Sequence, residues 1–322
     1  MTSKKILRIA RGEYTDNAAW FMRQAGRYLP DYMKIRAKVS FNNILRDRDL
    51  IKKITLAPLN YFPTDGLVIF TDILVPLFNL GYEVTYEEGI EITKRREREF
   101  DYYDELKHAI ASISTEKQDL TIIGVVGGPF TTFSYVNDGG RTGYPVTKAR
   151  IVDGNTAELN ALVDEILQFA RSQIDAGVDV IQVFESWIGS VSENFYSEHL
   201  KSMEEEFLEN LSSLGAPIIF FAEGATHLYG ELCRLPVDVF SLDWRMQLKR
   251  FNKYCNGSVV QGNLDPYLLK SSDDYIAKEV REIMKQGKTY RGHIFNLGHG
   301  VPPWADPRKL RFITEEVHAY EE

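Results

Sequence analysis

The alternation of short apolar runs with amphipathic segments of helical period constrains the fold of this chain most strongly. The runs are rich in β-branched and aromatic residues, a composition typical of strands buried on both faces of a parallel sheet. They cover residues 65–74, 120–129, 179–186, 217–224, 237–244, 258–266 and 291–300, and residues 20–22 form a weaker eighth candidate.

The segments between these runs carry helix signals. The apolar positions between residues 159 and 174 share one helix face, and Gly177 is a typical C-terminal stop. Ser190 and Glu193 have the spacing of a capping box. Residues 271–287 open with Ser and Asp and close with Lys, Gln and Gly, which suits both ends of a helix dipole.

Strand and helix therefore alternate about eight times, as in an α/β fold of the (β/α)8 TIM barrel type. An open doubly wound sheet is the alternative, although no G-x-G-x-x-G or P-loop pattern occurs. No Pro/Ser-rich linker interrupts the chain. We expect one barrel domain over residues 1–322, with a short N-terminal extension at about residues 1–15.

Composition excludes several classes of partner. A formal net charge of −8 over 322 residues argues against nucleic acid and anionic membranes as bulk partners. The sequence contains no run of about 18 apolar residues, so no membrane span is predicted. No signal peptide is expected either. The two cysteines, Cys233 and Cys255, lack metal-like spacing. We therefore expect neither a disulfide framework nor a zinc site, and a reducing, cytoplasmic setting.

Polar or small residues end almost every apolar run. They are Arg23, Asp72, Gly127, Gly128, Glu185, Ser186, Glu223, Asp243, Asn263, Asp265 and His299. In a barrel the carboxyl ends of the strands build the active site. One such carboxylate is commonly a helix cap, but a whole ring of polar groups is harder to explain by capping and indicates an enzyme.

Arg23, Asp72 and His299 each have a functional and a structural interpretation. Arg23 and Arg27 flank the turn-forming Gly26, so two guanidinium groups could converge on carboxylates or phosphates, or simply form surface ion pairs. Asp72 follows four apolar residues and either faces a site or caps a short helix. His299 lies between two glycines and either meets a ligand or is a loop histidine.

Taken together, the segments resemble the uroporphyrinogen decarboxylase family. "MRQAGRYLP" and "FTDIL" are similar to its two best-known motifs, and "GGPFTTFSY", "VFESWIG", "SLDW", "QGNLDP" and "FNLGHGV" follow in the family's order. The likeness runs from about Trp20 to near the C-terminus. The link from Glu87 to Leu120 looks shorter than in the family and carries "TKRREREF", and "GVPPWADP" is also unusual. These departures concern the expected entrance loops and leave the match at Asp72 intact.

The resemblance implies a (β/α)8 barrel, a homodimer, no cofactor, no metal, and the conversion of uroporphyrinogen III to coproporphyrinogen III by loss of four acetate carboxyls. It implies that the substrate carboxylates are bound by Arg23, Gln24, Ala25, Gly26 and Arg27. It places Asp72 against the pyrrole N–H groups. It adds Tyr135, Ser186 and His299 as contacts to substrate side chains, and Arg36 as a further candidate cation. On its own, Tyr135 could be a core aromatic residue and Ser186 a helix cap.

The residue types suit this chemistry. Decarboxylation needs an electron sink, and a pyrrole ring protonated on carbon supplies one without an organic cofactor. The cationic intermediate then needs a fixed negative charge, which Asp72 would provide. Asp72 and Arg23 are thus the expected catalytic residues. The proton could come from Arg23, from water or from a substrate carboxyl.

Two other functions compete with this one. A methyltransferase of the same superfamily would use zinc held by a His-x-Cys pair and a later Cys, but His227 is followed by Leu228 and Tyr229, and His299 stands where the later Cys is needed. A non-catalytic porphyrin carrier would keep the binding residues without turnover. The presence of Asp72 and both arginines argues against a carrier.

Overall fold

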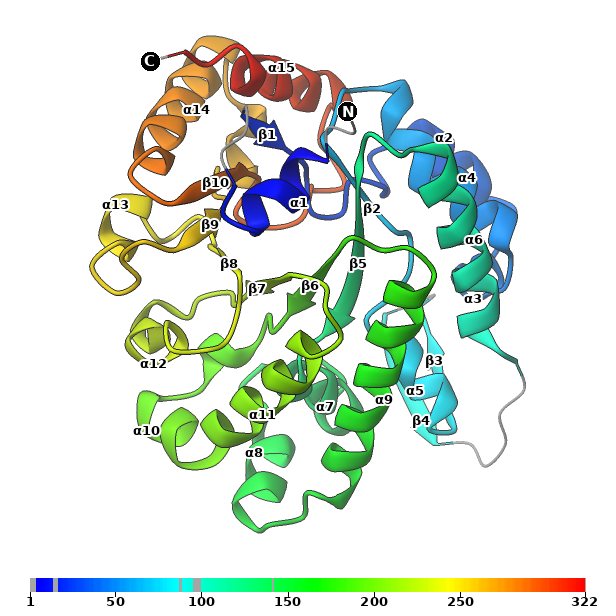
Figure 1. Cartoon of the computed structure of the whole chain (residues 1–322). Helices are drawn as coiled ribbons and strands as arrows, with labels where there is room; N and C mark the ends of the chain where they lie inside the picture. Colours follow the sequence, from blue (N-terminus) through cyan, green and yellow to red (C-terminus); the bar gives the residue numbers. More distant parts are fainter. Residues whose placement is uncertain (1–3, 14–16, 87–88, 95–99, 141, 322) are drawn as a thin grey trace.

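The computed structural model describes residues 4–13, 17–86, 89–94, 100–140 and 142–321. Within them, eight parallel strands form one sheet in the order β1-β10-β9-β8-β7-β6-β5-β2, with helices around its outer face (Figure 1). The strands are β1 (Ala18–Ala19), β2 (Gly66–Val68), β5 (Thr121–Gly127), β6 (Val180–Phe184), β7 (Ile218–Phe221), β8 (Val239–Ser241), β9 (Val259–Gln261) and β10 (Gly292–Phe295).

The helices are α1 (Lys5–Ala10), α2 (Pro30–Arg36), α3 (Phe41–Ile44), α4 (Arg48–Leu56), α5 (Val75–Asn79), α6 (Tyr102–Glu116), α7 (Pro129–Asp138), α8 (Pro145–Val152), α9 (Ala157–Asp175), α10 (Glu193–Phe195), α11 (Lys201–Ser212), α12 (Tyr229–Leu232), α13 (Leu248–Phe251), α14 (Asp273–Gly287) and α15 (Pro307–His318). No helix among the described residues is long and apolar enough to cross a membrane.

Asp65 joins the two ends of the sheet. Its backbone N–H donates to the carbonyl of Ala19 at 2.9 Å, and its Oδ2 accepts the N–H of Ala19 at 2.8 Å. Lys5 and His318 lie 3.4 and 2.6 Å from the same carboxylate. Burial raises the pKa of Asp65, but His318, the N–H of Ala19 and Lys5 together outweigh it, and the net shift is downward. The sheet is therefore a nearly closed barrel, which confirms the (β/α)8 prediction and makes the open doubly wound sheet wrong.

The barrel interior is packed at its amino end. The indole N–H of Trp20 donates to Gln261 at 2.8 Å, and the amide of Gln261 donates to Gln182 at 3.1 Å. Below this layer, the buried side chains of Ile6 and Ile9 on α1 pack against the inner faces of the strands. These contacts leave the carboxyl ends of the strands as the place for a site. The boundary of an N-terminal extension at about residue 15 stays a prediction.

Most predicted elements are present, with shifted ends. The candidate at residues 20–22 forms a strand two residues earlier, at Ala18–Ala19. Helix α9 covers the predicted face and Gly177 follows it with a φ of 110°. The capping box from Ser190 is wrong, because Ser192 caps α10 by accepting the N–H of Phe195. Ser190 instead ends a short 3₁₀ turn and donates to the carbonyl of Trp187.

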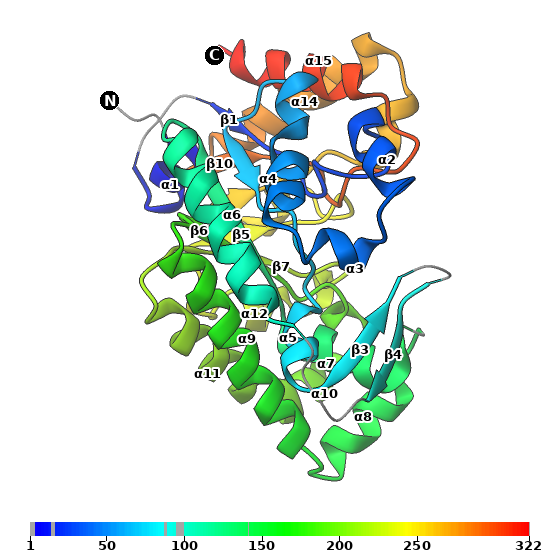
Figure 2. The ribbon, with the colours of Figure 1, turned by 90° about the vertical axis from the view of Figure 1, so that its right-hand side faces the viewer.

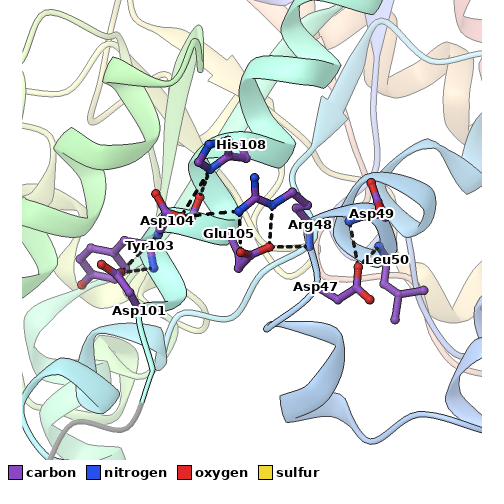
Figure 3. A network of polar contacts seen from close by, with 9 residues as sticks. All are labelled: Asp47, Arg48, Asp49, Leu50, Asp101, Tyr103, Asp104, Glu105 and His108. Carbon is purple, nitrogen blue, oxygen red and sulfur yellow. Dashed lines mark hydrogen bonds and ion pairs between the residues drawn. The ribbon is translucent and has the colours of Figure 1, made fainter.

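Helices α4 and α6 are tied together by their first turns (Figure 3). Arg48 of α4 donates to Glu105 of α6 at 2.8 and 2.6 Å, in a paired geometry. Asp47 caps α4 and Asp101 caps α6 through their carboxylates. The Arg48–Glu105 pair is only partly buried, and ion pairs open to solvent contribute little to stability, so we infer that the network acts mainly on the relative position of the two helices.

Cys233 and Cys255 form a disulfide, with their Cα atoms 5.5 Å apart. The expectation that no disulfide forms was therefore wrong. Sequence spacing of 22 residues gave no signal, because the packing of α12 on α13 brings the two cysteines together. The rings of Tyr229 and Phe251, on those two helices, lie 4.8 Å apart.

A hairpin outside the barrel was absent from the sequence-based prediction. Strands β3 (Tyr82–Thr85) and β4 (Glu91–Lys94) pair in antiparallel register and extend from beside α5 (Figure 2). The side-chain amide of Asn42 on α3 donates to the carbonyl of Val84 at 2.8 Å. The segment that looked short, between Glu87 and Leu120, thus supplies β4 and α6. Of its basic run, residues 95–99 lie outside the described residues.

Candidate active site

Asp72 lies in the loop that follows β2, at the carboxyl end of the barrel. Its Oδ1 accepts the backbone N–H of Leu74 at 2.8 Å. Burial raises the pKa of Asp72, and the N–H of Leu74, the hydroxyl of Tyr86 and the charge of Arg23 oppose that rise. Burial and the charge of Asp72 raise the pKa of Tyr135 to about 12, while Arg23 lowers it. Asp72, Arg23 and Tyr135 were all predicted from the sequence, and the charge of Arg23 acts on the pKa of both Asp72 and Tyr135.

The two arginines of the first motif present exposed cations beside Asp72. Arg23 has a φ of 57°, a left-handed conformation that costs a non-glycine residue about 1–2 kcal/mol. Its side chain runs across Gly300, where a Cβ would lie 2.5 Å from Cδ of Arg23. Arg27, Arg36 and Asp72 all affect the pKa of Tyr32, so these groups surround one phenol. In the described part of the chain, Arg23 and Arg27 form no ion pair with another side chain.

The residues between the two arginines form the turn that separates them. The N–H of Leu29 donates to the carbonyl of Gly26 at 2.9 Å. Ala25 and Gly26 are partly exposed, whereas the side chain of Gln24 is fully buried. The hydroxyl of Tyr28 donates to the carbonyl of Gln24 at 2.5 Å. The turn thus points both guanidinium groups outward, and the role of Gln24 as a ligand stays a prediction.

Glu185, at the carboxyl end of β6, fixes the start of α7. Its Oε2 accepts the N–H of Phe130 at 3.1 Å, and its Oε1 accepts the N–H of Thr131 at 2.7 Å and the hydroxyl of the same threonine. Gly128 permits this approach, since a Cβ there would lie 2.0 Å from Oε2 of Glu185. The N–H of Trp187 donates in turn to the Thr131 hydroxyl at 3.0 Å. Glu185 therefore couples the β6 loop to α7, which carries Tyr135.

Ser186 and Tyr135 lie on these two coupled segments. Ser186 is partly exposed, directly after Glu185. The ring of Tyr135 lies 4.0 Å from the indole of Trp187, which also stacks on Tyr144 at 4.8 Å. The charge of Asp72 raises the pKa of Tyr135, so the phenol lies within electrostatic reach of that carboxylate.

A buried acid, Glu204 of α11, lies behind Glu185. Both side chains are fully buried, and the carboxyl oxygens of Glu204 have no hydrogen-bond partner among the described residues. Burial raises the pKa of Glu185 to about 7, and burial together with the charge of Glu185 raises that of Glu204. The folded state therefore holds protons that the unfolded chain releases, so stability falls as pH rises from the ordinary glutamate pKa of 4.5 through about 7.

We expect the Glu204→Gln variant to lose much of this pH dependence. Glutamine keeps the size of the side chain but cannot ionise beside Glu185. Urea denaturation at pH 6 and at pH 8.5 would measure the difference in free energy of unfolding for both proteins. The variant is expected to show the smaller fall between the two pH values, and a fall as steep as that of the parent protein would contradict the assignment.

A second charged cluster spans the ends of β7, β8 and β10. Glu223 lies 3.5 Å from Nε2 of His299 and 3.3 Å from Arg245, and Arg245 lies 2.9 Å from Asp243. The guanidinium of Arg245 also lies 3.8 Å from the ring centroid of Trp244. Burial raises the pKa of Glu223, but His299 and Arg245 outweigh it and the net shift is downward. His299 is thus held at the carboxyl end of the barrel by an ionised carboxylate.

Sequence reasoning left Tyr86, Glu185 and Arg245 without a site role. Glu185 was visible as a polar residue at a strand end, but nothing in the sequence pairs it with Thr131. Arg245 follows the "SLDW" motif directly, and that position was the available signal. Tyr86 gave none, because it reaches the site from a hairpin that was not predicted.

The fold and these groups define a (β/α)8-barrel protein with its charged groups at the carboxyl ends of the strands, the arrangement typical of enzymes with this fold. Solved structures agree on the fold. A methyltransferase from Methanosarcina mazei has a TM-score of 0.81 at 16% identity, with 98% of both chains covered. A putative vitamin-B12 independent methionine synthase from Listeria monocytogenes has a TM-score of 0.56 at 13% identity, covering 96% of this chain and 98% of that one.

The sequence comparison is more specific. The family profile for uroporphyrinogen decarboxylase (URO-D) matches residues 1–320. A uroporphyrinogen decarboxylase from Staphylococcus epidermidis is 36% identical over 98% of this chain and 97% of its own length. One from Bacillus velezensis is 35% identical over 98% of this chain and 94% of its own length. The chain belongs to the uroporphyrinogen decarboxylase family, which is a family of carboxy-lyases.

The described residues contain no cluster of side chains that could bind the zinc ion of the methyltransferase alternative. No group of three or more His, Cys, Asp or Glu side chains there is arranged to hold a metal ion. His227, the histidine that this alternative requires, interacts through Nε2 with the carbonyl of Val191 at 2.8 Å. The likeness to the methyltransferase, at 16% identity, is a likeness of fold.

Proposed function

We propose that this chain removes the four acetate carboxyls of uroporphyrinogen III to give coproporphyrinogen III, without a cofactor. The observation that carries the proposal is the position of Asp72, a carboxylate within electrostatic reach of the exposed cation of Arg23 and of Tyr135 at the carboxyl end of the barrel. Membership of the family supports the choice of substrate. The homodimer and the cytoplasmic location stay predictions.

The substrate carboxylates would meet the cations first. Arg23 and Arg27 are exposed and have no ion-pair partner in the described chain, so their donors are available to acetate and propionate groups. His299 and Ser186 would contact substrate side chains from other strand ends. The chain is acidic as a whole, so these local cations are what makes an anionic substrate acceptable.

Each decarboxylation replaces one carboxylate by hydrogen. A proton adds to the pyrrole α-carbon next to the ring carbon that carries the acetate, the bond to the carboxylate breaks, and carbon dioxide leaves while its electron pair forms an exocyclic double bond and neutralises the ring cation. A second proton then reaches the methylene carbon and the ring carbon loses its proton, so the balance is one proton taken up for each CO2 released. Asp72 would accept pyrrole N–H groups and stabilise the cationic ring.

The direct test is an anaerobic incubation with reduced uroporphyrinogen III, followed by oxidation and chromatographic separation of the porphyrins. Products with seven to four carboxyl groups are the expected result. An absence of conversion together with tight binding of the product porphyrin would support a carrier instead and reject the proposal.

Replacing Arg23 by Ala is expected to raise KM about tenfold or more, because a charge-assisted hydrogen bond contributes about 1.5–3 kcal/mol. Steady-state kinetics under anaerobic conditions would measure the change. The matched control is Arg281→Ala, which removes an exposed arginine that pairs with Glu316 on the outer helices. A KM for the Arg23 variant equal to that of the control would count against substrate contact.

A further inference from the structure

A row of aromatic rings lies beside His299, on the loops that follow the neighbouring strands β8, β9 and β10 (Figure 1). The ring centroid of Trp244 lies 6.0 Å from those of His299 and Tyr267, and the ring of Tyr267 lies 6.4 Å from that of Trp304. Tyr267 and Trp304 are 62% and 40% exposed. We call Trp244, Tyr267 and Trp304 the aromatic strip. Exposed apolar residues that lie together, and not scattered singly, are typical of a binding surface.

Two cations lie on the ring faces of the aromatic strip. The guanidinium carbon of Arg245 lies 3.8 Å from the ring centroid of Trp244, and Nζ of Lys270 lies 4.8 Å from that of Trp304. Arg245 also pairs with Glu223 at 3.3 Å, whereas Lys270 is exposed and forms no ion pair within the described part of the chain. The charge of Lys270 is therefore available to an anion that binds at the Trp304 end of the strip.

The β10 loop connects the aromatic strip with the candidate active site. A Cβ at Gly300 would lie 2.5 Å from Cδ of Arg23, and a Cβ at Gly298 would lie 2.2 Å from the backbone nitrogen of Trp244. The loop that carries His299 between these two glycines is therefore in contact with both Arg23 and Trp244. The strip and the candidate active site are thus contiguous at the carboxyl end of the barrel.

Resting on the proposed function, we propose that the aromatic strip and Lys270 form a docking site for a carboxylated tetrapyrrole, next to the site around Asp72. Such a molecule consists of flat pyrrole rings with carboxylates at their edges, which matches aromatic faces that end in a free cation. Lys270 favours an anion, and the contact of the β10 loop with both Arg23 and Trp244 favours the same anion that Arg23 would bind.

A docking site at this place would serve a reaction that is repeated on one molecule. The four acetates lie on different pyrrole rings, so the macrocycle has to turn relative to the fixed catalytic groups between decarboxylations. A macrocycle that stays on the aromatic strip while it turns remains at a high effective concentration beside Asp72. Partly decarboxylated intermediates would therefore react further instead of being released.

The first experiment needs no turnover. Isothermal titration with uroporphyrin III, the oxidised form of the substrate, would measure its Kd for the parent protein and for variants. Trp304→Ala and Lys270→Ala are each expected to raise Kd about fivefold or more, and Lys270→Arg, which keeps the cation, to bind as the parent protein does. The matched control is Tyr254→Ala, which removes a 42% exposed ring from the segment that precedes β9. No binding to the parent protein, or a Kd for either alanine variant equal to that of the control, would overturn the proposal.

Self-association is the main alternative role of these exposed rings. Sedimentation velocity of the parent protein and of Trp304→Ala would compare their oligomeric states, which are expected to be the same. A changed oligomeric state in Trp304→Ala would identify the aromatic strip as an interface between copies of this chain and reject the docking site.

The second experiment follows turnover. At low conversion of uroporphyrinogen III, Trp304→Ala is expected to raise KM about fivefold and to release several times more porphyrins with seven to five carboxyl groups than the parent protein does. A KM and a product distribution equal to those of Tyr254→Ala would reject the docking site. If the parent protein converts no substrate, the proposed function fails, and the titration with uroporphyrin III still decides whether the strip binds a tetrapyrrole.

Discussion

The Asp72→Asn variant is expected to retain substrate binding and to lose turnover by a factor of about a hundred to a thousand or more. Asparagine keeps the shape of the side chain and its oxygen can still accept the N–H of Leu74, but the negative charge is gone. In the proposed reaction that charge stabilises a cationic ring, and a preorganised group of this kind typically contributes several kcal/mol to the transition state. The measurement is kcat and KM for uroporphyrinogen III under anaerobic conditions.

The same variant is expected to be at least as stable as the parent protein. Burial raises the pKa of Asp72, which means that the folded state disfavours its ionised form, so a neutral isostere removes an unfavourable charge. Thermal unfolding at pH 8 would show an equal or higher Tm. Asp306→Asn is the control, since it changes an exposed capping carboxylate at the start of α15. Turnover by Asp72→Asn similar to that of this control would eliminate the proposed role of Asp72.

The Glu185→Ala variant is expected to unfold about 3 kcal/mol more easily and to lose activity as well. The substitution leaves the N–H groups of Phe130 and Thr131 buried without their acceptor, at about 1–3 kcal/mol for each unsatisfied group. It also releases the start of α7 from β6, and α7 carries Tyr135. Urea denaturation at pH 7 would measure the stability.

Two comparisons separate this effect from a general loss of an acid. Glu209→Ala removes an exposed carboxylate from α11 and is expected to change stability by less than about 0.5 kcal/mol. Glu185→Gln keeps one acceptor oxygen and is expected to lie between the parent protein and Glu185→Ala. A Glu185→Ala variant as stable as Glu209→Ala would show that Glu185 does not hold the two segments together.

The barrel class could be predicted because the apolar runs read as strands buried on both faces and alternate with helices about eight times. The same argument placed polar residues at the carboxyl ends, and the structure brings Asp72, Arg23 and Tyr135 together there. Local signals were less reliable. Ser190 and Glu193 satisfied the spacing of a capping box, yet the 3₁₀ turn at Ile188–Ser190 moved the cap to Ser192.

The sequence by itself determined the alternation of strands and helices, the residues that end each strand, and the turn that exposes Arg23 and Arg27. These follow from periodicity and turn chemistry, which act over a few neighbouring residues. Only the tertiary structure decided the disulfide between Cys233 and Cys255 and the hydrogen bonds from the N–H groups of Phe130 and Thr131, at the start of α7, to Glu185. Each of these joins residues from different elements, and their distance depends on how those elements pack and not on any spacing along the chain.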